Sequence, residues 1–197
     1  MKEIRPSSRE ALLAAATRIL AANPGASLGD VAARAGVGRA TLYRQFRSRD
    51  ELIRELTLQA IRATDEAVAP IQHRAVSATE MLHEVIEAVV PLGDRYYFLS
   101  REFEVMKDPT IARELERQLR ELSELIEAVK TERHLAPEVP TAWIVATLDA
   151  LIYAAWSAQD NGLIASHDAA ALVLRTLFEG LGSRDTTVKK KRAAFRR

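Results

Sequence analysis

The chain has 197 residues, of which 48% are hydrophobic and 28% are charged, a composition typical of a folded globular protein rather than a disordered one. It contains no cysteine, which excludes disulfides, thiolate metal sites and cysteine nucleophiles, and favours a reducing cytoplasm. The N-terminus has no apolar signal-peptide stretch, and no segment approaches the roughly 18 uninterrupted apolar residues of a membrane span. We therefore expect a cytoplasmic protein without a membrane partner.

The net charge of +1 conceals an uneven distribution along the chain. Residues 1–50 carry 9 basic and 4 acidic side chains, residues 183–197 carry 7 and 1, and the stretch between them carries 12 and 22. Only the two ends are therefore suited to a polyanion such as DNA.

Apolar residues recur at helical spacing almost throughout, and the sequence lacks alternating β-type runs, so we predict an all-α fold of about nine helices. Ser7 and Glu10 have the spacing of a reciprocal N-terminal cap, and Asn23-Pro24-Gly25 ends the helix that they open.

Three further helices follow within the first seventy residues. Ser27 and Asp30 repeat the capping spacing and open a short helix that Gly36 ends. The next runs from about residue 38 to 46, and a fourth, capped by Ser48 and Glu51, continues toward Pro70. Later helices are predicted at 77–90, 94–106, 109–133, 138–160 and 166–181.

These elements suggest three parts. We predict a helix-turn-helix DNA-binding domain at residues 1–50, a helical ligand-sensing and dimerisation domain at 51–182, and a basic tail at 183–197 with too few apolar residues to pack. The tail is either a solvated end or an arm that contacts DNA.

Residues 35–38, Ala-Gly-Val-Gly, have the composition of the tight turn in a helix-turn-helix, whose second helix enters the major groove. In the helix that follows, Leu42 and Phe46 lie one turn apart and suit the core. The other side chains can bind bases and phosphates, because arginine pairs with guanine, glutamine with adenine and tyrosine with the backbone.

The segment SLGDVAARAGVGRATLYRQFRSRDELIREL, residues 27–56, resembles the signature of the TetR family of transcriptional regulators. The resemblance implies that Ser27 and Arg49 contact phosphates and that Tyr43 contacts the DNA backbone. It also implies that base readout falls to Arg39, Arg44 and Gln45. The predicted DNA-binding residues are Ser27, Gly38, Arg39, Ala40, Thr41, Tyr43, Arg44, Gln45 and Arg49.

Three alternatives bear on this set. Gly38 departs from the family pattern, which often has a serine or threonine there, and loss of that helix cap costs about 1 kcal/mol. Ser27 could serve only as a cap. The arginines, together with Arg47, could form a solvated basic face.

A module of this size reads few bases, so such proteins bind palindromic operators as dimers with half-sites about 34 Å apart. In the helix at 138–160 an alanine recurs at every fourth position, which gives a smooth ridge that suits either a second subunit or a neighbouring helix of the same subunit. The predicted dimer interface comprises Ala142, Ala146, Ala150, Ala154, Ala158, Leu174, Leu177 and Phe178.

A regulator of this kind senses a small apolar or amphipathic ligand in a cavity between its middle helices. The large side chains there are the candidates, although an aromatic residue at helical spacing is more often part of the core. The candidates are Tyr97, Phe98, Phe103, Met106, Trp143, Tyr153 and Trp156.

Two other functional classes were weighed. An enzyme is disfavoured, because no nucleophile–base pair, phosphate-binding glycine loop or metal motif is recognisable, and no cofactor or metal is expected. An architectural DNA-binding protein without sequence preference is favoured only by the basic tail.

Overall fold

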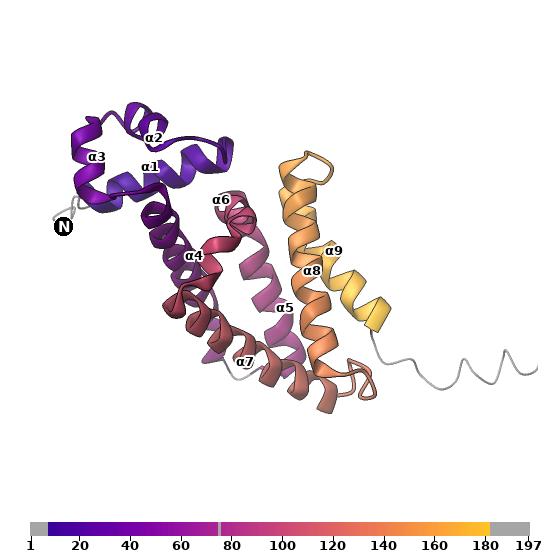
Figure 1. Cartoon of the computed structure of the whole chain (residues 1–197). Coiled ribbons are helices and arrows are strands. Elements are labelled where there is room, and N and C mark those ends of the chain that lie inside the picture. Colours follow the sequence, from indigo (N-terminus) through magenta and orange to yellow (C-terminus); the bar gives the residue numbers. More distant parts are fainter. Residues whose placement is uncertain (1–7, 75, 182–197) are drawn as a thin grey trace, which may run out of the picture. The chain divides into compact units, whose positions relative to one another are not determined.

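The computed structural model describes residues 8–74 and 76–181, and within these the fold is all-helical, as predicted. Figure 1 shows the helices in chain order. Their bounds are α1 Ser8–Ala22, α2 Leu28–Arg34, α3 Arg39–Gln45, α4 Arg49–Gln72, α5 Ala78–Val89, η1 Val90–Leu92, α6 Gly93–Tyr96, η2 Tyr97–Arg101, η3 Phe103–Lys107, α7 Pro109–Thr131, α8 Thr141–Asp160 and α9 Ser166–Leu181.

The chain forms two compact units, and neither is continuous in sequence. The N-terminal unit contains the described residues up to Ala69 together with Pro91–Glu116, and the C-terminal unit contains Pro70–Val90 and the described residues from Arg117 onward. The predicted functional boundary at residue 50 therefore falls inside the N-terminal unit, because α4 up to Ala69 and the segment after α5 pack with the first three helices.

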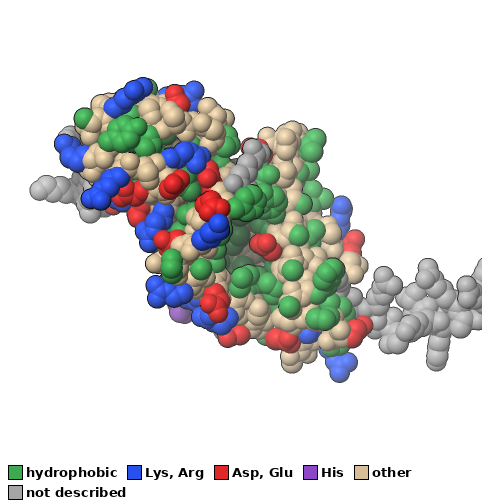
Figure 2. Space-filling model, viewed as in Figure 1, with side chains coloured by type: hydrophobic (Ala, Val, Ile, Leu, Met, Phe, Trp, Pro, Cys, Tyr) green, Lys and Arg blue, Asp and Glu red, His purple; other side chains and the backbone are tan. Residues whose placement is uncertain are grey.

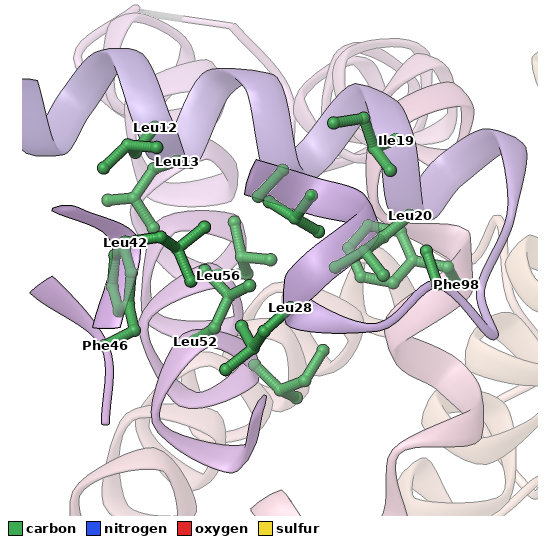
Figure 3. Close-up of a cluster of buried hydrophobic side chains, with 14 of the residues drawn as sticks. Leu12, Leu13, Ile19, Leu20, Leu28, Leu42, Phe46, Leu52, Leu56 and Phe98 are labelled. Carbon is green, nitrogen blue, oxygen red and sulfur yellow. The ribbon is translucent and has the colours of Figure 1, made fainter. Parts of the chain in front are cut away.

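The core of the N-terminal unit is one cluster of buried apolar side chains from α1, α2, α3, α4, α6 and η2 (Figure 3). Leu42 and Phe46 are the buried residues supplied by α3 and its C-cap, and they pack beside Leu52 and Leu56 of α4. The prediction that these two side chains face the core is confirmed by their burial.

The turn between α2 and α3 is closed by backbone hydrogen bonds. The Val37 amide donates to the Ala32 carbonyl (3.1 Å) and the Gly36 amide donates to the Ala33 carbonyl (3.3 Å), which is the Schellman arrangement that ends a helix. Gly36 has a φ of 69°, in the left-handed region where a Cβ atom is unfavourable. The predicted glycine turn is therefore present, with Gly36 as the residue that requires glycine.

The segment predicted as one helix at 94–106 is not one helix. A single turn of α-helix, α6, is followed by the 3₁₀ segments η2 and η3, which are separated at Glu102. In a 3₁₀ turn, residues three apart lie on one line along the helix, whereas in an α-helix they are rotated apart. The 3₁₀ geometry therefore places the buried Tyr96 and Leu99 on the same face. Tertiary burial here prevails over helical propensity.

The C-terminal unit has its own core, built from α5, α7, α8 and α9. Ile144, Val145 and Leu148 of α8 pack in the same buried cluster as Val173 and Leu177 of α9, and the α8–α9 contact is the most extensive between helices. Two carboxylate contacts with the ends of neighbouring helices tie the unit together.

The first of these contacts is at the start of α5, where the Glu132 carboxylate accepts hydrogen bonds from the Ala78 and Thr79 amides (2.7 and 2.9 Å). The second is at the start of α8, where the Glu127 carboxylate accepts a hydrogen bond from the Thr141 hydroxyl. Both carboxylates have lowered pKa values, caused first by the threonine hydroxyls.

Helix α8 is long and apolar enough, by length and composition, to cross a membrane, and 22% of its most apolar window is buried. A core helix passes the same criterion. This property is therefore weak support for a membrane span, but it raises the question of what α8 packs against on its exposed side.

We predict that Gly36→Ala destabilises the N-terminal unit by roughly 1–2 kcal/mol, because an L-residue must adopt a left-handed conformation there. The space is not limiting, since no atom lies within 4 Å of the added Cβ. Urea denaturation of the purified protein measures the change. Gly25→Ala is the matched control, since its φ is not positive and its Cβ would lie an ordinary 3.6 Å from Asn23 Oδ1. Equal costs at both positions would contradict the conformational explanation.

Candidate nucleic-acid interface

Helix α3 presents the polar face that the sequence predicted. Arg39, Ala40, Tyr43 and Arg44 are exposed, with half of the Tyr43 side chain open to solvent. Thr41 and Gln45 are half-buried at the edges of this face. Figure 2 shows arginine side chains distributed over the surface of the first three helices. This face combines cationic groups, an amide and a phenol, which are the groups that bind base edges and phosphates.

The start of α3 has no side-chain cap. Gly38 is the N-cap residue, with an extended backbone (φ −63°, ψ 143°) and no hydrogen bond from a side chain to the free amides. These amides remain available at the N-terminus of a helix whose dipole favours an anion. Gly38 therefore leaves backbone donors where the family pattern often places a hydroxyl.

Arg9, which the sequence did not indicate, holds the other end of α3. Its guanidinium lies 4.6 Å from the centroid of the Phe46 ring and donates to the Gln45 carbonyl at 3.0 Å. It also pairs with Glu55 of α4 at 3.2 Å. A cation at a helix C-terminus stabilises the last carbonyls and the helix dipole. No local signal could have revealed this role, because Arg9 and Gln45 are 36 residues apart.

Ser27 acts as a helix cap in this structure. Its hydroxyl accepts from the Asp30 amide (3.2 Å) and donates to the Asp30 carboxylate (2.7 Å), while its own amide donates to the same carboxylate (2.8 Å). This is the reciprocal capping box that the Ser27 and Asp30 spacing predicted. The hydroxyl proton is already donated, so a phosphate would have to compete with Asp30 for it.

The phosphate contact of Arg49 stays a prediction, and its guanidinium has partners of its own in this structure. The guanidinium donates twice to the Glu102 carboxylate (2.6 and 3.1 Å) and once to the Pro24 carbonyl (2.9 Å), and it is partly buried. The hydrogen bond to Glu102 raises the pKa of Arg49. In this structure its charge is paired within the N-terminal unit, where Arg49 joins the α4 N-terminus to Glu102 and to the loop before α2.

Arg39 is placed differently from the other cations of the interface. A Cβ built on Gly29 of α2 would lie only 3.2 Å from an Arg39 guanidinium nitrogen, so the side chain lies directly over this glycine. The Arg39 charge also contributes to lowering the pKa of Asp30. The lack of a side chain at Gly29 therefore provides the space that the Arg39 guanidinium occupies.

The predicted ligand residues are divided between the two units. Phe98 is 3% exposed in the core of the N-terminal unit beside Leu20 (Figure 3), so it is a structural residue of that unit. Phe103 and Met106 are exposed in the same unit, at 75% and 39%, and Tyr97 is half-buried. The remaining candidates belong to α8.

On α8, Trp143 and Tyr153 are exposed, at 62% and 41%, whereas Trp156 is half-buried and its indole N–H donates to the Val90 carbonyl at 2.7 Å. Of the three candidates on α8, Trp156 is therefore the one whose side chain is partly buried and hydrogen-bonded inside the C-terminal unit. The described residues contain no group of three or more histidine, aspartate and glutamate side chains able to hold a metal ion.

The predicted dimer-interface residues divide by exposure. Four ridge residues are exposed, namely Ala142, Ala146, Ala150 and Ala154, and Ala158 is half-buried. The ridge therefore does not pack against α9 of the same subunit.

Of the α9 residues, Leu177 is fully buried, and it is removed from the predicted interface because it has no surface to offer a partner. Leu174 and Phe178 are half-buried, and the Phe178 ring lies 4.8 Å from that of His83.

Comparison with known proteins agrees with this geometry. Residues 12–56 match the family model described as "Bacterial regulatory proteins, tetR family". The chain is 30% identical to the HTH-type transcriptional repressor LfrR of Mycolicibacterium smegmatis over 177 residues, which cover 90% of this chain and 92% of the relative. The chain belongs to the TetR family. It is thus a DNA-binding transcriptional regulator and not an enzyme, as the sequence predicted.

Solved structures give the same assignment for this TetR-family regulator. The crystal structure of LfrR in complex with proflavine superposes with a TM-score of 0.74 at 29% identity, covering 88% of this chain and 95% of that one. A second crystal structure of LfrR gives a TM-score of 0.60 at 27% identity, covering 87% of this chain and 97% of that one. The ketosteroid regulator KstR2 of Mycobacterium tuberculosis shares the fold at 15% identity, with a TM-score of 0.76 and coverage of 92% and 98%.

We predict that Ser27→Ala raises the pKa of Asp30 toward its ordinary value, because the Ser27 hydroxyl is the largest cause of its lowering. A lowered carboxyl pKa stabilises the fold above the unfolded-state pKa, and this contribution is lost as the pH falls through the folded-state value. The parent protein should therefore lose stability at more acidic pH than Ser27→Ala does. NMR titration of Asp30 and acid denaturation measure the two effects. An unchanged Asp30 titration in the variant would show that the capping box does not form in solution.

Proposed function

We propose that this TetR-family regulator is a ligand-responsive repressor of the cytoplasm, which binds a palindromic operator as a homodimer and is released by a small molecule bound in its C-terminal unit. The observation that carries the proposal is the exposed polar face of α3 on a buried support. Direct base readout needs such a face, and the DNA-binding relatives share the fold.

Within α3 we assign base readout to Arg44, Gln45 and Arg39, and backbone contacts to Tyr43. Arg44 is exposed in the last turn of α3 and forms no ion pair with the residues that the structure describes. Half of the Tyr43 side chain is exposed. Arginine in this position can bind guanine with two hydrogen bonds, which discriminates against other bases.

The dimer proposal rests on the exposed side of α8. The alanine ridge is continued by the exposed aromatic side chains of Trp143 and Tyr153, and hydrophobic side chains are visible along α8 in Figure 2. A helix that is apolar on both sides is expected where one side packs in the subunit core and the other against a partner. A second copy presenting the same ridge gives a two-fold interface in which small residues permit close approach.

The inducer proposal rests on Gln159 and Trp156 of α8. Both amide atoms of the Gln159 side chain are buried, and they have no hydrogen-bond partner among the described residues. Buried amides without partners are rare in native proteins and often mark a site where water or a ligand binds. Because LfrR has been crystallised with proflavine, a planar aromatic amine is the first class of ligand to test.

We predict that the purified protein protects a two-fold-symmetric site in DNA from upstream of its own gene, and that Arg44→Ala weakens this binding by about 1–3 kcal/mol. The measurement is a binding assay with scrambled competitor DNA across a salt series, followed by addition of proflavine to the complex. Arg175→Ala, which removes an exposed arginine of α9, is the control and should bind normally. Equal affinity for specific and scrambled DNA would instead support the architectural alternative.

The dimer interface gives a separate prediction. Ala150→Arg places a long cation in the middle of the exposed ridge and should convert the dimer into a monomer, because the charge loses its hydration in the interface. Light scattering after size exclusion measures the mass. Ala128→Arg, at an exposed alanine of α7, should leave the dimer intact. A dimeric Ala150→Arg protein would move the interface to another surface.

A further inference from the structure

A cavity of about 530 Å³ lies within the N-terminal unit, where α1 packs against α6. Its walls include Ala14, Arg18 and Ala21 of α1, Gln59 of α4, and Arg95 and Tyr96 of α6. All of these residues belong to the N-terminal unit, so the cavity is separate from the inducer site proposed near Gln159. Its volume falls in the range of small-molecule sites.

The charge at this cavity is positive. Arg18 and Arg95 are both exposed at its wall, and neither has an ion-pair partner among the residues that the structure describes. No described carboxylate lines it. Burial raises the pKa of the Tyr96 hydroxyl, and of the nearby α4 side chains Glu66 raises this pKa further while Arg62 lowers it. Two unpaired guanidinium groups on the wall of one cavity match a carboxylate, which arginine binds with paired hydrogen bonds.

The Gln59 side chain in the cavity wall has a buried oxygen without a hydrogen-bond partner among the described residues. An amide oxygen left without a donor calls for a donor from a bound molecule. The alanines beside it leave an apolar surface that fits a flat ring or a short chain.

We propose that this cavity is a second effector site, which binds a small hydroxylated aryl carboxylate with its carboxylate on Arg18 and Arg95 and its hydroxyl donating to Gln59. Such a ligand bridges α1, the first helix of the DNA-binding unit, and α6. It therefore favours whichever arrangement of these two helices it fits. Because coupling between sites is reciprocal, DNA binding and ligand binding then change each other's affinity whenever that arrangement differs between the free and DNA-bound protein.

Isothermal titration of the full-length protein with 4-hydroxycinnamate tests the site directly and does not require a known operator. Cinnamate lacks the hydroxyl and 4-hydroxycinnamamide lacks the charge, so each should bind at least 10-fold more weakly. Arg18→Gln and Arg95→Gln should each weaken 4-hydroxycinnamate at least 10-fold. Gln59→Leu should remove the preference for 4-hydroxycinnamate over cinnamate.

Arg175→Gln, a neutralised arginine of α9, is the matched control and should bind 4-hydroxycinnamate as the parent does. Thermal melting of each variant tests whether the fold is retained. The Arg18→Gln and Arg95→Gln proteins should melt as the parent does, since both arginine side chains are exposed. Absence of binding by the parent, or equal binding by Arg18→Gln, Arg95→Gln and the parent, would overturn the proposal. Neither outcome bears on operator binding or on proflavine, which are measured separately.

Discussion

The recognition helix depends on the burial of two side chains. Helix α3 has seven residues, too few for a helix to be stable alone in water. It persists because Leu42 and Phe46 are almost completely buried against α1 and α4, and because Arg9 binds its last carbonyl and covers the Phe46 ring. The rigid backbone that results lets the exposed side chains of α3 be aimed at DNA.

The N-terminal unit is also held together by a segment from later in the chain. Residues 91–116 return to pack with the first helices, and two ion pairs fasten them to α4: Arg49 with Glu102 at 2.6 Å and Arg54 with Asp108 at 2.7 Å. Arg49 in addition donates to the Pro24 carbonyl in the loop before α2. Residues 91–116 are therefore joined to α4 and to the loop before α2 by contacts that lie within one compact unit.

Helix α8 has two different apolar sides. One side carries Ile144 and Leu148 into the core of the C-terminal unit, and the other exposes small alanines with two aromatic side chains. This division explains why the helix is apolar enough to pass a membrane criterion while only a fifth of its most apolar window is buried within the chain. A partner helix on the exposed side would account for that composition.

Local patterns in the sequence determined the helix-turn-helix and most helix boundaries, because capping boxes, glycine turns and 3.6-residue periodicity act over a few residues. Ser27 with Asp30, Gly36, and the pair Leu42 and Phe46 all lie as these patterns predict. The tertiary structure alone decided that Arg49 pairs with Glu102, that Arg9 supports α3, and that Phe98 belongs to the N-terminal core. These contacts join residues 36 or more positions apart, so their partners cannot be read from neighbouring residues. The 3₁₀ segment after α6 was not predictable for the same reason. Its geometry depends on the core residues against which Tyr96 and Leu99 pack.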